Sequence, residues 1–368
     1  MRYKIAMLIL CISCAAPESP NTPIKARILA SDADGSYDIQ DVEFETLASI
    51  APLEGTLASV KSGAVLTLNQ DLEEIIVSEH PEDIYSNPGY GFDVNYKLID
   101  QVIHPKDFNS MAALAIYYNF EKTFKFWEDF NGLTLEQFGY TTIHNNPTVE
   151  IKDEVISSKT QMKSNASFII GVRHLNFHKK TSRTSIPIKM NQGIMAHEFF
   201  HSLFDVMVAE KDSRFYVRDY KGSAVLRAIN EGLADFFAIL ATQNSDFISA
   251  SLPELKDSRT PPVPWTESNF TLQCFNYGYC LGSVLNSALY ESGQSIGMEV
   301  VARYVLSALP KLGDQWRALE TSDSSVTEYE VYEFANLVLN EATDAHRQTL
   351  CESMIRWFDS SKGELNCN

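Results

Sequence analysis

The chain has 368 residues, of which 45% are apolar, so it can bury the core of one large domain or of two ordinary ones. This composition excludes a globally disordered chain. Acidic residues outnumber lysine and arginine by 48 to 30, and the net charge of −18 makes nucleic acid an unexpected partner. The sequence has no apolar run of the roughly 18 to 20 residues that span a bilayer.

The N-terminal segment has the layout of a secretory signal peptide. Two basic residues precede an apolar run over 5–16 that ends in small residues. Its residues up to Cys14 resemble a bacterial lipobox, which predicts a signal peptide over 1–13, a lipid anchor at Cys14 and a tether over 14–26. Simple cleavage in the alanine-rich stretch is the alternative. We expect an exported lipoprotein of the bacterial outer membrane or cell surface, or else a periplasmic or secreted protein.

The next region, residues 27–106, is predicted to be small and rich in β-structure. Short β-like runs at 42–44 and 64–68 alternate with turn-forming patches. A helix follows over 111–130, where aromatic residues recur every three or four positions and Asn131-Gly132 supplies a stop. We expect this aromatic stripe to lie in the core. Two runs, around Val149 and over 166–172, are predicted to be strands of one sheet.

The chain after residue 192 is predicted to be helical. The pattern favours helices near 192–208, 223–243, 280–292, 295–309 and 327–358. A proline-rich stretch at 256–269 is expected to be an irregular loop, a kind of segment that often borders a binding cleft.

Four cysteines remain beyond the signal region, an even number that suits an exported protein with disulfides. Local loops would pair Cys274 with Cys280 and Cys351 with Cys367. Free buried thiols are the alternative.

Two histidines lie four residues apart in the segment from His197 to His201, which reads H-E-F-F-H. On a helix, such residues have Cβ atoms about 5 to 6 Å apart on one face, so both imidazoles can bind one metal ion. Glu198 projects beside that position. The alternative is a helix with two ordinary, partly buried histidines.

Two acids interrupt the apolar helix predicted over 223–243. Glu231 and Asp235 lie on one side of it, and burying carboxylates is costly unless they are paired or bound to metal. Two imidazoles and a metal ion would supply the cationic partner. A solvated helix edge is the alternative.

Together these blocks resemble the gluzincins, zinc metallopeptidases of which thermolysin is the best known. The H-E-x-x-H block and the N-E-x-x-x-D block that starts at residue 230 match the family pattern. The resemblance implies that His197, His201 and Glu231 bind Zn²⁺, that Asp235 orients His197, and that Glu198 is the catalytic general base.

Weaker matches flank these blocks. Asn165-Ala166, before an apolar run, resembles the family's edge strand, which pairs with the substrate backbone. Segment 282–290 resembles the helix after the family's catalytic histidine, and Tyr279 stands at the position of that histidine. The resemblance implies that Tyr279 donates to the oxyanion of the tetrahedral intermediate. Arg259 is the candidate for the arginine that clamps the substrate.

The predicted fold class is α+β, with a thermolysin-like zincin catalytic unit. Its mixed α/β lobe, over 107–208, contains the edge strand and the H-E-x-x-H helix. An all-helical lobe follows over 209–368, and the β-rich region precedes both.

The predicted function is hydrolysis of peptide bonds by zinc-activated water, with Glu198 as general base and Tyr279 as oxyanion donor. We expect Zn²⁺ as cofactor, a peptide or protein as substrate, a monomer, and contact with the membrane only through the lipid anchor. One alternative is a catalytically inactive cell-envelope lipoprotein that binds zinc or peptides. Another is an adhesion or assembly lipoprotein in which the matching blocks are coincidental.

Overall fold

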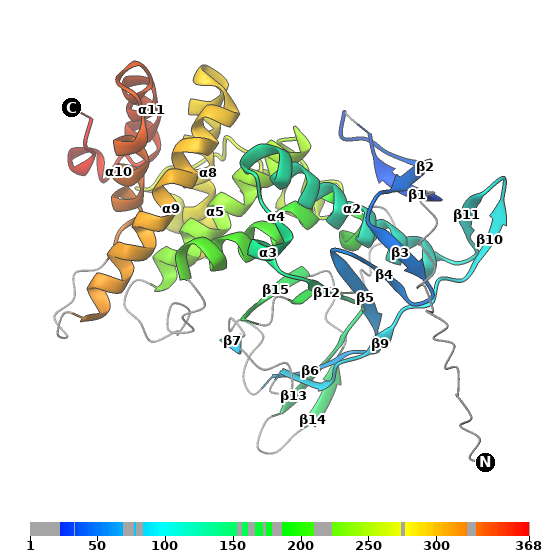
Figure 1. Cartoon of the computed structure of the whole chain (residues 1–368). Coiled ribbons are helices and arrows are strands. Elements are labelled where there is room, and N and C mark those ends of the chain that lie inside the picture. The colour runs from blue at the N-terminus through cyan, green and yellow to red at the C-terminus, as the bar shows by residue number, and fades with distance from the viewer. Residues whose placement is uncertain are drawn as a thin grey trace, which may run out of the picture.

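The computed structural model describes residues 23–32, 34–68, 77–78, 84–152, 157–160, 166–171, 174–178, 186–209, 223–273, 277–321 and 329–367. The chain is mixed α/β, with a β-rich N-terminal region and a helical C-terminal part (Figure 1), in agreement with the coarse architecture predicted from the sequence. Among the described residues no helix is both long and apolar enough to cross a membrane. The signal peptide, Cys14, Asn165 and Cys274 lie outside the described residues.

The strands form three sheets. The first, in spatial order, is β10 (Tyr96–Ile99), β11 (Val102–Pro105), β1 (Ile24–Ser31) and β2 (Tyr37–Phe44). The second is β3 (Leu47–Ile50), β4 (Leu53–Gly55), β5 (Ala58–Ser62), β12 (Thr141–Asn145), β16 (His174–Phe177), β15 (Ala166–Gly171) and β7 (Val77–Ser78), with β9 (Tyr90–Gly91) paired to β5. The third is β14 (Ser157–Thr160), β13 (Thr148–Lys152), β6 (Val65–Leu68) and β8 (Tyr85–Asn87).

The prediction that the runs around Val149 and over 166–172 belong to one sheet is wrong. Strand β13 pairs with β6 and β14, whereas β15 pairs with β16 and β7. The chain turns between β12 and β13 at Asn146, whose φ of 56° is left-handed. That turn directs β13 into a different sheet.

The β-rich region predicted over 27–106 does not form the second sheet by itself. Strand β5 pairs in parallel with β12, so strands from both sides of residue 106 share that sheet.

The helices follow the predicted order, with different ends. They are α2 (Phe108–Asn131), α3 (Leu135–Phe138), α4 (Gln192–Phe204), α5 (Ser223–Thr242), α6 (Lys256–Arg259), α7 (Phe270–Gln273), α8 (Tyr277–Ile296), α9 (Met298–Thr321), α10 (Val331–Glu341) and α11 (Asp344–Trp357). A π-helical turn, Asp205–Ala209, extends α4. Short 3₁₀ turns occupy Ile188–Met190, Pro253–Leu255 and Lys362–Glu364.

Three helical boundaries differ from expectation. Helix α9 continues past Pro310, because Leu312 and Trp316 beyond the proline are buried in the core. The predicted segment 327–358 is two helices, separated where Ala342 and Thr343 adopt extended backbone. The proline-rich stretch at 256–269 begins with the short helix α6 before it becomes irregular.

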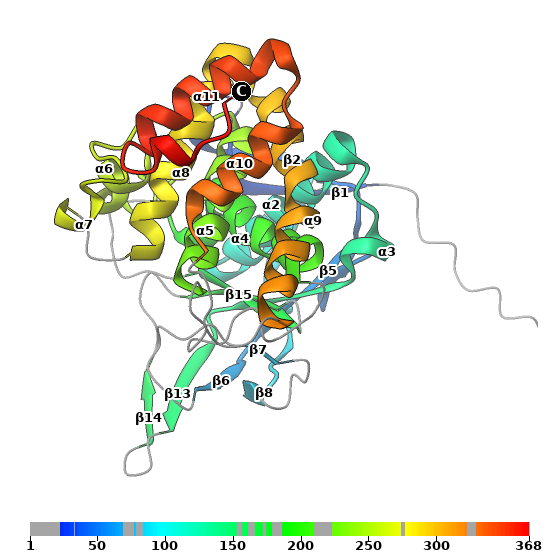
Figure 2. The same ribbon diagram turned by 90° about the vertical axis from the view of Figure 1, so that its left-hand side faces the viewer.

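Aromatic packing fixes the orientation of α4, the helix that contains the H-E-x-x-H motif. Phe199 stacks on Phe138 of α3 with ring centroids 4.3 Å apart, and Phe200 stacks on Phe237 of α5 at 4.6 Å. Trp127, from the aromatic stripe of α2, contacts Phe200 and Phe237. This stripe is buried, as expected. Helix α4 lies over strand β15, as both views show (Figures 1 and 2).

The start of α4 is fixed by a buried cap. The Asn191 side chain accepts hydrogen bonds from the amides of Gly193 and Ile194, two groups that lack a partner within the helix. Its amide also donates to the Phe247 carbonyl and to Ser251 Oγ. One side chain therefore ties the motif helix to the segment after α5.

Helices α5 and α8 cross with their backbones in close contact at two glycines. A Cβ atom on Gly232 would lie 2.3 Å from the Gly282 carbonyl oxygen, and one on Gly282 would lie 2.7 Å from the Ala228 carbonyl oxygen. Neither position has room for a side chain. Because Glu231 and Tyr279 lie one and three residues from these glycines, the crossing sets the distance between them.

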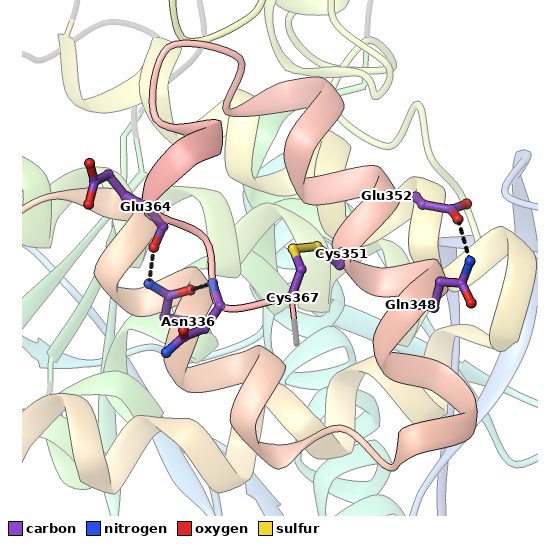
Figure 3. Close-up of a disulfide and its surroundings, with 7 residues drawn as sticks. Asn336, Gln348, Cys351, Glu352, Glu364 and Cys367 are labelled. Atoms are coloured by element: carbon purple, nitrogen blue, oxygen red, sulfur yellow. Dashed lines mark hydrogen bonds between the residues drawn. A yellow bond between two sulfur atoms is a disulfide. The ribbon is translucent and has the colours of Figure 1, made fainter.

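The C-terminal tail is fastened to the helical part by a disulfide. Cys351 in α11 is bonded to Cys367, with their Cα atoms 5.7 Å apart (Figure 3). Asn336 of α10 donates to the Glu364 carbonyl and accepts from the Asn366 amide beside it. For the other predicted pair, Cys280 is buried in α8, and Cys274 is not among the described residues.

We predict that Gly232→Ala lowers the free energy of unfolding by about 1 to 3 kcal/mol, because the added methyl group forces α5 away from α8. Alanine is otherwise the better helix former. Urea denaturation would measure the change. Gly363→Ala is the matched control: nothing lies within 4 Å of a Cβ there, and we expect a change within about 0.5 kcal/mol. A Gly232→Ala protein as stable as the wild type would contradict the close-contact argument.

Candidate metal centre

Three side chains from two helices converge on one point. The Nε2 atoms of His197 and His201, on α4, are 3.1 Å apart. Glu231 Oε2, on α5, lies 3.4 Å from His197 Nε2 and 3.9 Å from His201 Nε2. Among the described residues these three form the group of histidine, cysteine and acidic side chains able to hold a metal ion, with ligand atoms within 4.8 Å of one another.

The arrangement fits a divalent metal ion. Zinc–nitrogen distances of about 2.0 to 2.1 Å place neighbouring ligands of a tetrahedral site about 3.4 Å apart, close to the separations observed. Glu231 Oε2 is buried and has no well-oriented hydrogen bond among the described residues. Two imidazoles and one carboxylate form a donor set that suits zinc.

Each histidine is oriented by a second partner on α5. His197 Nδ1 lies 2.9 Å from Asp235 Oδ1, and His201 Nδ1 lies 2.9 Å from Asn230 Oδ1. If both Nδ1 atoms donate in these contacts, both Nε2 atoms are left to accept, which is the tautomer that metal binding requires. The sequence led us to expect the Asp235 contact. It gave no role to Asn230.

The carboxylates around His197 carry negative charge that a cation has to balance. His197, Glu231 and Asp235 are all less than a tenth exposed. Burial opposes charge on His197, but the Asp235 and Glu231 carboxylates outweigh it and raise its pKa to about 9. Burial likewise opposes ionisation of Glu231, yet the two imidazoles and a nearby arginine lower its pKa to about 2. The carboxylates thus hold a proton on His197, where a metal ion would supply the positive charge.

Arg259 contacts the carboxylate that lies against His197. Its Nε and Nη2 donate to both carboxylate oxygens of Asp235, at 2.6 and 2.7 Å. The side chain is buried, and Nη2 lies 3.8 Å from Glu231 Oε2. Through Nε and Nη2, Arg259 holds the Asp235 carboxylate against His197, and its role as a substrate clamp stays a prediction.

Glu198 lies beside the ligands. Burial raises the pKa of its carboxyl to about 7, even though the positive charges of His197 and Arg259 oppose that change. The Phe168 backbone of β15 hydrogen-bonds to this carboxyl. Strand β15 therefore borders the metal centre directly.

The strands that the structure describes cover the outer edge of β15 only in part. One edge pairs with β16 from Ala166 to Ile169, and on the other edge β7 pairs only with Ile170 and Gly171. Among the described strands, none covers Ala166 on that second edge. An open edge can pair with an extended peptide. The role of Ala166 in binding a substrate backbone stays a prediction.

Tyr279 belongs to the same cluster. Its ring lies beneath the Arg259 guanidinium, 4.7 Å from centroid to Cζ, and beneath that of Arg227 at 5.6 Å. The negative charge of Glu231, followed by burial, raises the pKa of the Tyr279 phenol, which therefore keeps its proton at neutral pH. Sequence reasoning identified Tyr279 but missed Arg227, although Arg227 precedes Glu231 by one helical turn.

We predict one zinc ion per chain, with binding abolished in His197→Ala and in His201→Ala. Asp235→Asn should weaken zinc binding about ten- to a hundredfold, because it removes the acceptor that orients His197. Competition with a chromophoric chelator would measure the affinity of each purified protein, and circular dichroism would confirm that each is folded. His346→Ala, remote in α11, is the control. Full zinc occupancy in the double histidine variant would refute the assignment.

Comparisons with known proteins give little guidance. No family model matches the sequence, and no curated protein matches it. Among solved structures, the chain is similar to the precursor of protealysin, a metalloproteinase from Serratia proteamaculans. The two share 12% identity over 82% of this chain and 88% of that one, with a TM-score of 0.42. This likeness does not assign the chain to a family.

Proposed function

We propose that this protein is a zinc-dependent endopeptidase of the gluzincin type. The observation that carries the proposal is the convergence of His197, His201 and Glu231 next to a buried carboxyl, that of Glu198, which is not one of the three ligands. Strand β15, whose second edge is not covered at Ala166 by any described strand, hydrogen-bonds to that carboxyl through the Phe168 backbone. Two histidines and an acid as ligands, with a separate acid beside them, form a set suited to hydrolysis.

Zinc bound by His197, His201 and Glu231 would supply Lewis acidity toward water and toward a substrate carbonyl. Glu198 would accept a proton from the attacking water and deliver it to the departing amine. Its buried position shields the carboxyl from bulk solvent, which favours proton transfer within the site.

Tyr279 would stabilise the transition state. Its phenol is protonated and can donate a hydrogen bond to the developing oxyanion. The contact of the ring with Arg259 restrains its orientation. The free edge of β15 at Ala166 would pair with the substrate backbone in extended form.

We predict that Glu198→Gln and Tyr279→Phe separate two catalytic roles. Glu198→Gln should keep zinc, since Glu198 is not a ligand, yet lose essentially all hydrolysis because the proton acceptor is gone. Tyr279→Phe should keep zinc and lower kcat about a hundred- to a thousandfold, the usual cost of one lost oxyanion donor. Both can be measured with a peptide library and the zinc-loaded protein.

Tyr304→Phe is a matched control, because this tyrosine bonds to His346 away from the metal centre. If Tyr279→Phe retains kcat within about threefold of the wild type, another residue donates to the oxyanion. A zinc-loaded wild-type protein that cleaves no peptide would favour the inactive zinc- or peptide-binding lipoprotein.

We also propose that the protein is an exported monomeric lipoprotein, anchored by its N-terminus in the bacterial outer membrane or at the cell surface. The proposal rests on the signal-like segment and the lipobox at Cys14. We predict a mature N-terminus at Cys14 that carries lipid, and Cys14→Ser should prevent its attachment. Intact-mass spectrometry of the membrane fraction would show either result. An unmodified Met1 in soluble cytosol would contradict export.

A further inference from the structure

Two guanidinium groups lie over the ring of one tyrosine at the metal centre. Arg259 approaches from α6 and Arg227 from α5, both over Tyr279. Placing two positive charges at one ring is unfavourable unless acids balance both of them. Arg259 and Arg227 differ in whether a carboxylate of the protein lies within ion-pair distance.

The charge of Arg259 is balanced within the protein. It forms a bidentate ion pair with Asp235 and lies close to Glu231, and it is buried. Its donors therefore face the protein's own carboxylates.

Arg227 has no such partner. Among the residues that the structure describes, no carboxylate lies within ion-pair distance of its guanidinium. Its side chain is only partly buried, and its aliphatic part follows the first turn of α8 at Gly278. It precedes Glu231 by four residues on α5, so both lie on one face of that helix.

The acids of the site are already engaged. Asp235 contacts His197 and Arg259, Glu231 is one of the three candidate ligands, and Glu198 bonds to the backbone of β15. An anion that pairs with Arg227 must therefore come from outside the cluster. A guanidinium presents planar, paired donors that match a carboxylate in bidentate geometry.

We propose that Arg227 binds a carboxylate of the peptide substrate beside Tyr279. The preferred substrates are then peptides with a negative charge near the cleaved bond, either the C-terminal carboxylate or an aspartate or glutamate side chain. The inference rests on the proposed function, because it places the substrate at the same metal centre. It makes Arg227 a residue that determines specificity.

The test measures peptide binding without turnover. Zinc-loaded Glu198→Gln protein is titrated with fluorescent peptides in matched sets: C-terminal acid or amide, and aspartate or glutamate against asparagine or glutamine at each position. The same titrations are made with Arg227→Gln and with Arg303→Gln added to that background. Arg303 is the matched control, since it also lies over an aromatic ring, that of Phe130, in contact with helix α2 and away from the metal centre.

The expected result is a preference for one class of carboxylate of about ten- to a hundredfold over its neutral counterpart, the usual range for a charged hydrogen bond. This ratio should fall toward one in Arg227→Gln and persist in Arg303→Gln. The set that shows it, C-terminal or side-chain, identifies the source of the carboxylate.

The inference is overturned if the ratio is the same with and without Arg227, or if the protein binds no peptide. Hydrolysis by the wild-type protein is scored separately. Absence of hydrolysis together with an Arg227-dependent preference would refute the proposed peptidase but leave carboxylate recognition in place. In an active enzyme, Arg227→Gln should raise KM for the preferred peptides more than it lowers kcat, because the contact is already made in the ground state.

Discussion

The cost of burying carboxylates governs the organisation of this molecule's centre. Glu198, Glu231 and Asp235 all lie in an otherwise apolar core, where an unpaired charge would cost several kcal/mol. Arg259 balances one of these charges by its ion pair with Asp235. The remaining negative charge draws a proton onto His197, or it can be met by a divalent cation. The buried charges can therefore be balanced either by that proton or by a divalent cation held by His197, His201 and Glu231.

That charge arrangement depends on apolar packing on the opposite side of the same helices. Phe199 and Phe200 lie between Glu198 and His201 in α4. Their stacking on α3 and α5 turns His197 and His201 toward Glu231. The close contact at Gly232 and Gly282 brings α8 so near to α5 that the charge of Glu231 raises the pKa of Tyr279. The geometry of the candidate metal centre and the stability of the core are therefore coupled. A change in the core would move the candidate ligands, and loss of one of them would leave a buried charge uncompensated.

Where sequence-based expectations failed, the reason was non-local. The strand around Val149 has the same alternation of apolar and polar residues whichever sheet it joins. Only the turn at Asn146 and the pairing with β6 decide which sheet contains it. The helix predicted near 295–309 ends too early, because buried residues beyond Pro310 keep α9 helical. No local pattern reveals that Asp235, on a separate helix, accepts hydrogen bonds from Nε and Nη2 of Arg259. Nor does any local pattern reveal that the Arg227 guanidinium lies over the ring of Tyr279.

The sequence by itself determined the local elements of the site. Spacing of four residues places His197 beside His201, and Glu231 beside Asp235, on any helix, whatever surrounds it. The spacing of aromatic residues likewise predicts the buried stripe of α2, and the preference of glycine for left-handed backbone predicts its end at Gly132. Only the tertiary structure decided that the two helices face each other at ligand distance and that Asn230 and Asp235 contact the two imidazoles. It also decided that Arg259 pairs with Asp235, whereas Arg227 has no carboxylate partner among the described residues. The physical reason is that metal coordination and ion pairing act over a few ångströms between residues distant in sequence, and such contacts exist only once the chain has packed.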